Sequence, residues 1–392
     1  MRVDLLSREY PPEVYGGAGV HLEYLARELR KLADVRVRCF GAERDESGVS
    51  AYQVPGGLES ANAALQVLGV DLEMAAACAG ADVVHSHTWY ANFAGHVAKM
   101  LHGIPHVVTT HSLEPLRPWK AEQLGGGYAI SSWAEHTALA AADAVIAVSE
   151  GMRRDVLAAY PGIDPAKVSV IHNGIDTAEY APDDGHEVLR KHGIDPARPY
   201  VIFVGRITRQ KGLVHLLHAA RSFAPDAQLV LCAGAPDTPE IEAEVAGLVR
   251  GLDREGVFWI SEMLPKPQII QLLTHAAVFV CPSVYEPMGI VNLEAMACET
   301  AVVATATGGI PEVVADGETG LLVPIDQAPD GTPHDPGRFA ADLAERVNAL
   351  LGDPARAAAM GRAGRVRAVE HFSWERVARR TADLYASLRE TG

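Results

Sequence analysis

The chain has 392 residues, of which 48% are hydrophobic, 21% charged and 6% aromatic, and its formal net charge is −16. This length is typical of two or three domains with an ample core, and the composition is that of a soluble globular protein. The acidic balance argues against nucleic acid as a partner and disfavours binding to anionic membranes.

No targeting or membrane-spanning segment is expected. The apolar run at the N-terminus is too short for a signal peptide, and no stretch approaches the ~18 apolar residues of a membrane helix. The five cysteines lie apart without a Cys-x-x-Cys pair, which favours reduced and buried thiols. These observations predict a cytoplasmic protein.

The N-terminal segment predicts a strand, a glycine-rich turn, a helix and a second strand. The strands are expected at 1–6 and 35–40, and the turn is Gly16-Gly17-Ala18-Gly19. Leucines follow the turn at the spacing of one helical face: Leu22, Leu25, Leu29 and Leu32. A glycine-rich turn that leads into a helix can hold a phosphate, although a tight turn without a ligand explains so short a run equally well.

Polar side chains follow two neighbouring predicted strands. A strand at 81–84 runs into a stretch that contains His85, His87, Thr88 and Tyr90. The next strand, at 106–110, ends in His111. Because α/β proteins bind ligands at the carboxyl ends of parallel strands, two strands that deliver histidines favour a shared site, with His111 the best candidate. The alternative is a structural role for each histidine.

Strands and helices alternate as far as residue 175, which predicts a doubly wound parallel sheet. Within this half, residues 112–127 are expected to form a loop that carries Arg117 and Lys120. Residues 176–198, rich in Pro, Asp and Gly, are predicted to be a linker. The alternation then restarts, and it gives way to a helical tail at 338–392 in which Phe372 and Trp374 are expected to be anchors.

The second half places two cations between a strand and a helix. A strand at 200–204 leads into Gly205-Arg206-Ile207-Thr208-Arg209-Gln210-Lys211-Gly212. Arg206 and Lys211, beside backbone donors and a helix N-terminus, suit a diphosphate; the alternative is an exposed basic loop. The segment is neither a P-loop nor a dinucleotide-binding G-x-G-x-x-G motif.

The stretch 278–298 predicts a strand, a loop and a helix that begins at Pro287. Glu286 would lie at the mouth of this helix and Glu294 inside it, roughly 12 Å apart at helical rise. That spacing suits a sugar and a ribose on either side of a diphosphate, and the N–H groups of Met288, Gly289 and Ile290 would face the anion. The alternative is a pair of solvated glutamates.

No pattern in the sequence implies a metal or another cofactor. HExxH, Cys-x-x-Cys and DxD motifs are absent from the segments that carry the candidate residues. Arg206 and Lys211 are therefore expected to neutralise a leaving diphosphate in place of a metal ion.

Seven motifs in this order resemble those of the retaining GT-B glycosyltransferases of family 4: EYPP with GGAG, VVHSHTW, TTHS, VIHNGID, GRITRQKG, EPMGIVNLE and TGGIPEVVADGETGLLV. The resemblance covers the whole chain and is greatest to the bacterial branch of glycogen synthases and α-maltose-1-phosphate synthases. It implies two Rossmann-like domains that face a cleft. They would be an acceptor-side domain at 1–178 and a nucleotide-sugar-binding domain at 179–370, with a helix at 371–392 packing back on the first domain.

The resemblance also implies roles for individual residues. Arg206 and Lys211 would bind the diphosphate of ADP-glucose or another nucleotide-sugar donor, and Glu286 would contact the sugar hydroxyls. Glu294 would contact the ribose, and His111 the donor glucose near its primary hydroxyl. The remaining donor-binding residues would be Gly17, Met288, Gly289, Ile290 and Val291.

Departures from the polymer-extending synthases lie on the acceptor side. Val14 stands where those enzymes have a lysine, and Thr88 and Tyr90 replace an acid and a histidine. These changes favour a small acceptor, and glucose 1-phosphate is the expected one. The acceptor-side candidates are His85, His87, Thr88, Tyr90, Lys120 and His136, with Arg8, Lys99 and Arg117 as further cations for its phosphate.

The predicted activity is therefore retaining transfer of glucose from ADP-glucose to glucose 1-phosphate, giving α-maltose 1-phosphate. The alternatives are a glycogen synthase that extends an α-glucan, a family 4 transferase that uses a UDP- or GDP-sugar with a small-molecule or lipid acceptor, and a non-catalytic sugar-nucleotide-binding protein. We expect no nucleic-acid or membrane partner, and a homodimer is one arrangement that the sequence allows.

Overall fold

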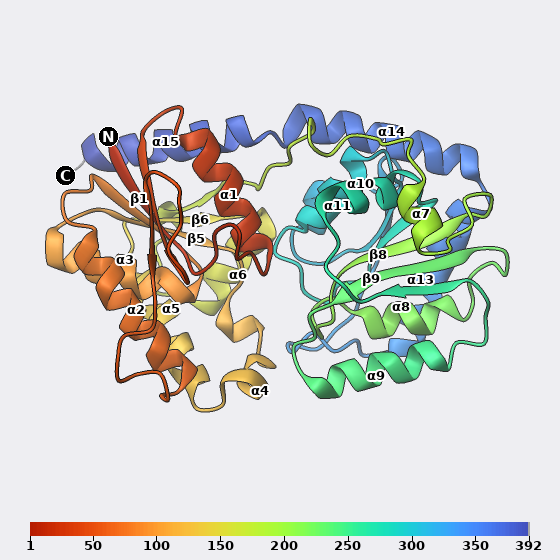
Figure 1. Ribbon diagram of the computed structural model, residues 1–392, viewed down its shortest axis with the longest axis horizontal. Coiled ribbons are helices and arrows are strands. Elements are labelled where there is room, and N and C mark those ends of the chain that lie inside the picture. Colours follow the sequence, from red (N-terminus) through yellow and green to blue (C-terminus); the bar gives the residue numbers. More distant parts are fainter. Residues whose placement is uncertain (391–392) are drawn as a thin grey trace. The chain divides into compact units, whose positions relative to one another are not determined.

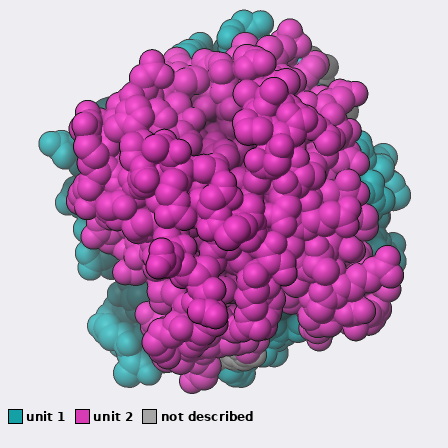
Figure 2. Space-filling view, turned by 90° about the vertical axis from the view of Figure 1, so that its right-hand side faces the viewer, with its two compact units in different colours: residues 1–174, 374–392 teal, residues 175–373 magenta. Residues whose placement is uncertain are grey.

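The computed structural model describes residues 1–390 and divides the chain into two compact units (Figure 1). Unit 1 combines residues 1–174 with the segment that begins at residue 374, and unit 2 contains residues 175–373. Figure 2 colours the two units separately. The sequence pattern placed these boundaries at 178 and 370, and the last two residues of the predicted terminal helix lie outside the described part of the chain.

Unit 1 is built on a parallel sheet with the strand order β3-β2-β1-β4-β5-β6-β7 in the described residues. Its strands are β1 Arg2–Leu6, β2 Asp34–Phe40, β3 Val49–Tyr52, β4 Val83–His87, β5 His106–Thr110, β6 Ala144–Ala147 and β7 Val168–Val170. Its helices are α1 Gly17–Leu29, α2 Ala63–Ala77, α3 Trp89–His102, η1 Glu114–Leu116, α4 Lys120–Leu124, α5 Gly127–Ala141, α6 Glu150–Ala159, η2 Pro165–Lys167 and α15 Trp374–Glu390.

Different helices cover the two faces of this sheet (Figure 1). Successive side chains of a strand point to opposite faces. Val3 accordingly packs with α1 and α15, whereas Leu6 packs with α2 and α3. Residues at positions 83, 85 and 87 of β4 share the face that α1 and α15 cover.

The C-terminal helix α15 completes unit 1 by packing on α1. The Trp374 ring stacks on Tyr24 with 5.5 Å between ring centroids, and Tyr385 is fully buried. Phe372 and Trp374 are both buried, as the sequence predicted for anchors of the tail.

Unit 2 repeats the doubly wound plan with the order β10-β9-β8-β11-β12-β13 among the described residues, and its neighbouring strands are parallel. Its strands are β8 Tyr200–Arg206, β9 Gln228–Gly234, β10 Val257–Ile260, β11 Val278–Cys281, β12 Val302–Thr305 and β13 Gly320–Val323. Its helices are α7 Glu187–Lys191, α8 Leu213–Ala220, α9 Pro239–Arg250, α10 Lys266–Thr274, α11 Ile290–Ala297, α12 Ile310–Val313, α13 Pro336–Leu351 and α14 Pro354–His371.

Two predicted connections contain regular structure. Residues 176–198 are not a free linker, because they belong to unit 2 and include helix α7, where Val188 and Leu189 are buried. The predicted loop at 112–127 includes η1 and α4. Polar composition suggested loops in both places, but a few buried apolar side chains are enough to dock such short helices.

Composition predicted buried, reduced cysteines, and each of the cysteines is buried and free of a disulfide in the described residues. Within residues 1–390, no helix combines the length and the apolar character needed to cross a membrane.

Candidate active site

The strand order of each sheet reverses beside its first strand. In unit 1, β1 lies between β2 and β4, and in unit 2, β8 lies between β9 and β11. The connections on either side of such a strand run to opposite faces, which leaves a crevice at the carboxyl ends where α/β proteins bind ligands. The predicted site residues follow β1, β4 and β5 in unit 1, and β8 and β11 in unit 2.

In unit 2, the loops after β8 and β11 are joined by an ion pair. Lys211 Nζ donates to Glu286 Oε2 at 2.6 Å, and Ser283 Oγ donates to the same oxygen at 3.1 Å. Burial disfavours the charge on Lys211, but the charge and hydrogen bond of Glu286, together with the nearby Cys281, outweigh this effect and raise the pKa of Lys211. The two residues predicted to contact diphosphate and sugar therefore lie side by side, with the lysine charged.

Two glycines allow this close approach. Gly212 has φ +64°, and a Cβ at this position would collide with the carbonyl oxygen of Pro282. Gly308 has φ +54°, and its Cβ would collide with the carbonyl oxygen of Glu286. A larger residue at either position would strain the backbone and displace the loop that carries Glu286.

Arg206 ends strand β8 and is held by an acidic partner. Its Nη1 donates to Asp237 Oδ1 at 3.0 Å, in the loop that follows β9. The Arg206 side chain is 23% exposed, so part of the guanidinium faces solvent. Asp237 orients the second predicted diphosphate ligand, and no sequence motif had singled it out.

The helix that carries Glu294 begins at Ile290, and the predicted start at Pro287 is wrong. Gly289 precedes the helix with φ +86°, a left-handed conformation that a right-handed helix cannot include. The 12 Å estimate, which assumed one continuous helix from Glu286, therefore does not apply. Gly289 offers no capping side chain, so the N–H groups of Ile290 and Val291 are suited to an anionic ligand.

The two remaining donor-side residues are largely enclosed. Met288 is 1% exposed, so its side chain belongs to the core. Glu294 Oε1 accepts a hydrogen bond from Tyr180 at 3.2 Å, and burial raises the pKa of Glu294. Tyr180 lies in the segment predicted to be a linker, which is why sequence reasoning missed it.

In unit 1, the glycine-rich turn opens α1 as predicted, and a carboxylate accepts from two backbone N–H groups just before the helix. Glu9 Oε2 accepts from the N–H groups of Tyr15 and Gly16 at 2.8 and 2.7 Å. Gly17 is exposed at the first position of α1, and Gly16 gives the helix no side-chain cap. An anion at Gly17 would therefore approach close to the Glu9 carboxylate.

His85 is a structural residue, which corrects its assignment to the acceptor side. It is fully buried, with Nδ1 hydrogen-bonded to the Tyr385 hydroxyl at 2.5 Å and Nε2 to Thr109 Oγ1 at 2.7 Å. Both ring nitrogens thus tie β4 to β5 and α15. Neither is available to a ligand.

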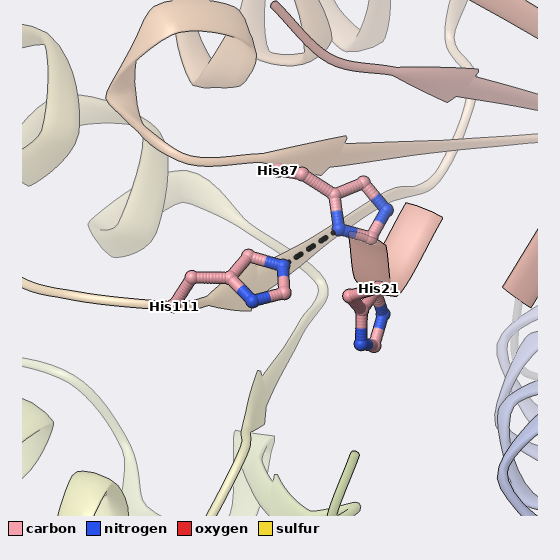
Figure 3. Close-up of side chains that lie close together, drawn as sticks. All are labelled: His21, His87 and His111. Carbon is pink, nitrogen blue, oxygen red and sulfur yellow. Dashed lines mark hydrogen bonds between the residues drawn. The ribbon is translucent and has the colours of Figure 1, made fainter. Parts of the chain in front are cut away.

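His87 and His111 approach each other as predicted, and a third histidine joins them (Figure 3). His87 Nδ1 and His111 Nε2 are 3.0 Å apart, and the His21 ring of α1 lies against both, at centroid distances of 5.3 and 4.7 Å. Burial lowers the pKa of His21 to about 4 and places the pKa values of the other two well below their usual range. The cluster is therefore neutral at physiological pH.

His21 was missed because its contacts depend on tertiary structure. It precedes Leu22 on α1 and carries no local motif. The two rings meet because side chains alternate between the faces of β4, and this alternation turns His87 toward the face covered by α1.

Thr88 and Tyr90 lie at the carboxyl end of β4. Thr88 has φ +63°, which is unusual for a β-branched residue and stores strain at the start of α3. The exposed Arg8 guanidinium lies over the Tyr90 ring, 4.4 Å from its centroid. Arg8 thus follows β1 and Tyr90 follows β4, and these two strands are neighbours in the sheet.

The other predicted cations differ in position. Lys99 is bonded to Asp143 at 2.7 Å beside the starts of β5 and β6, at the opposite ends of the strands from His87 and His111, so it is not among the cations near those histidines. Arg117 donates to Ser112 Oγ at 2.7 Å, next to His111. Lys120 is 6% exposed, whereas His136 is exposed and packs on Tyr160.

Two family models match successive parts of the chain. Glycosyltransferase Family 4 matches residues 15–179, and Glycosyl transferases group 1 matches residues 185–367. The alpha-maltose-1-phosphate synthase of Mycolicibacterium smegmatis is 60% identical over 392 residues, which cover 98% of this chain and 99% of that protein. The chain belongs to the family 4 glycosyltransferases. The alpha-maltose-1-phosphate synthase of Mycobacterium tuberculosis is 58% identical to this glycosyltransferase over 390 residues, 98% of this chain and 99% of that protein.

More distant relatives of this glycosyltransferase keep the family and the fold. A D-inositol 3-phosphate glycosyltransferase of Pseudarthrobacter chlorophenolicus is 32% identical over 317 residues, 78% of this chain and 70% of that protein. Sucrose-phosphate synthase from Thermosynechococcus elongatus has a TM-score of 0.81 at 24% identity and covers 100% of both chains. Anabaena HepE in complex with UDP and glucose has a TM-score of 0.78 at 22% identity, covering 99% of this chain and 100% of that chain. The fold is GT-B, as the sequence predicted.

Proposed function

We propose that this glycosyltransferase transfers glucose from ADP-glucose to glucose 1-phosphate, giving α-maltose 1-phosphate and ADP for glycogen and α-glucan synthesis in the cytoplasm. The proposal rests mainly on the similarity to alpha-maltose-1-phosphate synthases from two mycobacterial species, which are 60% and 58% identical over 98% of this chain. The ion pair of Lys211 and Glu286 supports it, since the two residues proposed to bind the diphosphate and the sugar hydroxyls are in contact.

On the donor side, Lys211 and Arg206 receive the diphosphate. Both side chains are positioned in advance, by Glu286 and Asp237 respectively, so little reorganisation is needed when charge develops on the leaving group. The bond from the anomeric carbon to the diphosphate breaks, and the acceptor hydroxyl oxygen bonds to that carbon. The hydroxyl proton leaves with the departing phosphate. We propose retention of the α configuration without a covalent enzyme intermediate, and no metal in the step.

On the acceptor side, a small phosphorylated sugar fits the residues present. Val14, Thr88 and Tyr90 replace polar groups of the polymer-extending synthases, and Arg8 over Tyr90 supplies a cation near the end of β4. The relatives at about one-third identity also carry names with a phosphorylated acceptor, D-inositol 3-phosphate. Of the cations that the sequence left open, Arg8 is therefore our choice for the acceptor phosphate.

The test is a comparison of acceptors and donors with purified protein. ADP-glucose is mixed with glucose 1-phosphate, glycogen or D-inositol 3-phosphate, and ADP release and product mass are followed. UDP-glucose and GDP-glucose replace the donor in parallel. We expect a phosphorylated disaccharide to form fastest with ADP-glucose and glucose 1-phosphate. A preference for glycogen would identify a chain-extending synthase, and no nucleotide release with any pair would identify a binding protein.

A further inference from the structure

The cluster of His21, His87 and His111 has the composition and spacing of a metal-binding site. One ring nitrogen from each histidine lies within 4.8 Å of one from each of the others. The residues come from α1, the end of β4 and the residue after β5, and their rings converge in Figure 3. All belong to unit 1, so a single compact unit supplies the whole cluster.

The hydrogen bonds of the cluster leave lone pairs available. His21 Nδ1 bonds to Asn173 Oδ1 at 2.7 Å, so Nδ1 carries the proton and Nε2 carries the lone pair. Among the described residues, His21 Nε2 has no hydrogen-bond partner, although it is buried. A buried polar atom without a partner is costly, and a metal ion is one way to satisfy it.

We propose that His21, His87 and His111 bind a divalent transition-metal ion of the zinc class, and that the bound ion inhibits glucosyl transfer by engaging His111. The inhibitory part rests on the proposed function, in which His111 contacts the donor glucose. The site itself does not.

Ligand type and geometry select the metal. Imidazole nitrogens suit zinc, cobalt, nickel and copper, whereas magnesium and calcium require oxygen ligands. Tetrahedral zinc with nitrogens at 2.0–2.1 Å holds them roughly 3.4 Å apart. The nitrogens that are up to 4.8 Å apart need to approach by up to about 1.4 Å, while those of His87 and His111, now 3.0 Å apart, separate by about 0.4 Å as the ion replaces their hydrogen bond. The fourth position stays open to water.

The neighbouring groups support this assignment. Asn173 accepts a hydrogen bond from His21 Nδ1 and leaves Nε2 for the metal. Metal-bound histidines are usually oriented by such a hydrogen bond from the ring nitrogen that does not bind the ion. His85 is excluded as a fourth ligand because both of its nitrogens are bonded to Tyr385 and Thr109. The Trp374 ring packs edge-on against His21 and shields that side.

The site is tested with tag-free full-length protein titrated with cobalt(II), followed by visible absorbance, and with zinc(II), followed by calorimetry. We expect one ion per chain and the intense visible bands of tetrahedral cobalt. His21→Gln should weaken binding at least tenfold, and Asn173→Ala, which frees the His21 ring, roughly 10–100-fold. His371→Gln, at an exposed histidine of unit 2, is the matched control and should bind as wild type. Circular dichroism confirms that each variant is folded.

Inhibition is measured as zinc-dependent loss of ADP release, reversed by EDTA. Wild type should be inhibited, and His21→Gln should keep its activity at the same zinc concentration. Absence of cobalt bands, or equal binding by wild type and His21→Gln, would overturn the site. Binding without inhibition would overturn the inhibitory role. If wild type releases no ADP with any acceptor, the proposed function fails, while the cobalt spectrum still decides whether the site exists.

Discussion

At the scale of residues, the sequence singled out the candidate donor-side residues but not the side chains that contact them. Arg206, Lys211 and Glu286 were found from their residue types between strands and helices. Their neighbours Asp237 and Ser283 were not, because contacts between separate loops leave no local signal. The same limit explains the misassigned His85. The sequence around a histidine at a strand end does not reveal whether its side chain contacts a helix such as α15 or a ligand.

Removing the Lys211 charge should reduce turnover with little effect on folding. In Lys211→Ala, Glu286 loses its 2.6 Å partner and the leaving diphosphate loses a preorganised cation. Loss of one such group typically costs about 10²–10³-fold in kcat. The measurement is steady-state ADP release. Lys191→Ala is the control, because Lys191 is exposed and pairs with surface Glu262. An unchanged kcat for Lys211→Ala would remove Lys211 from the mechanism.

At the scale of elements, periodicity predicted the alternation of strands and helices, and a positive φ angle explains why one helix begins later than predicted. Gly289 delays α11 to Ile290 because its left-handed conformation cannot be part of the helix. The contact of α15 with β4 joins positions about 300 residues apart, so only the family resemblance suggested it. The Tyr385 phenol on α15 and the buried Glu135 carboxyl on α5 allow two separate tests at this scale.

The Tyr385 hydroxyl should stabilise the packing of α15 on the sheet. Tyr385→Phe keeps the ring but leaves His85 Nδ1 buried without its 2.5 Å partner. An unsatisfied buried polar group costs about 1–3 kcal/mol. Urea unfolding should show a loss of this size in the free energy of unfolding. Thr381, also on α15, donates to the Val377 carbonyl within its own helix, so Thr381→Val should cost less. Equal losses would contradict a specific role for His85.

The buried Glu135 carboxyl should make stability depend on pH. Burial, reinforced by the nearby charge of Glu114, raises the pKa of Glu135 to about 8 from an ordinary value of 4.5. The folded state therefore keeps a proton that the unfolded state releases above pH 4.5. The associated stability is fully present below pH 4.5 and is lost as pH rises through about 8, by at most ~1.4 kcal/mol per pH unit.

Glu135→Gln removes this titration while keeping an oxygen that can accept from Tyr160 and from the Glu114 N–H. The free energy of unfolding of both proteins is measured in urea at pH 5 and pH 8. From pH 5 to pH 8, the variant's stability relative to wild type should increase by a few kcal/mol. Parallel pH dependence in the two proteins would mean that Glu135 is ionised in the folded state.

At the scale of the whole molecule, the sequence predicted two doubly wound units because the strand–helix rhythm stops and restarts. It also predicted that site residues follow β1, β4, β8 and β11, since parallel strands deliver their ends to one edge of a sheet. The convergence of three histidines in unit 1 could not be predicted, because it requires knowing that α1 covers the face on which His87 points.

Charge accounting predicts that transfer needs no metal. Arg206 and Lys211 supply the positive charge for the diphosphate, so dialysis against EDTA should leave the rate of ADP release unchanged. The same assay with added magnesium is the control. A collapse of activity that Mg²⁺ or Mn²⁺ restores would show that a metal ion carries part of this charge.

The most direct test of the central claim is the structure of the product, determined by two-dimensional NMR correlating ³¹P with ¹H after reaction of ADP-glucose with glucose 1-phosphate. The account predicts one phosphorylated disaccharide in which both the phosphate and the new glucosyl linkage are α. A β-glucosyl linkage would contradict retention, and a glucose 1-phosphate signal that persists while ADP accumulates would contradict the proposed acceptor.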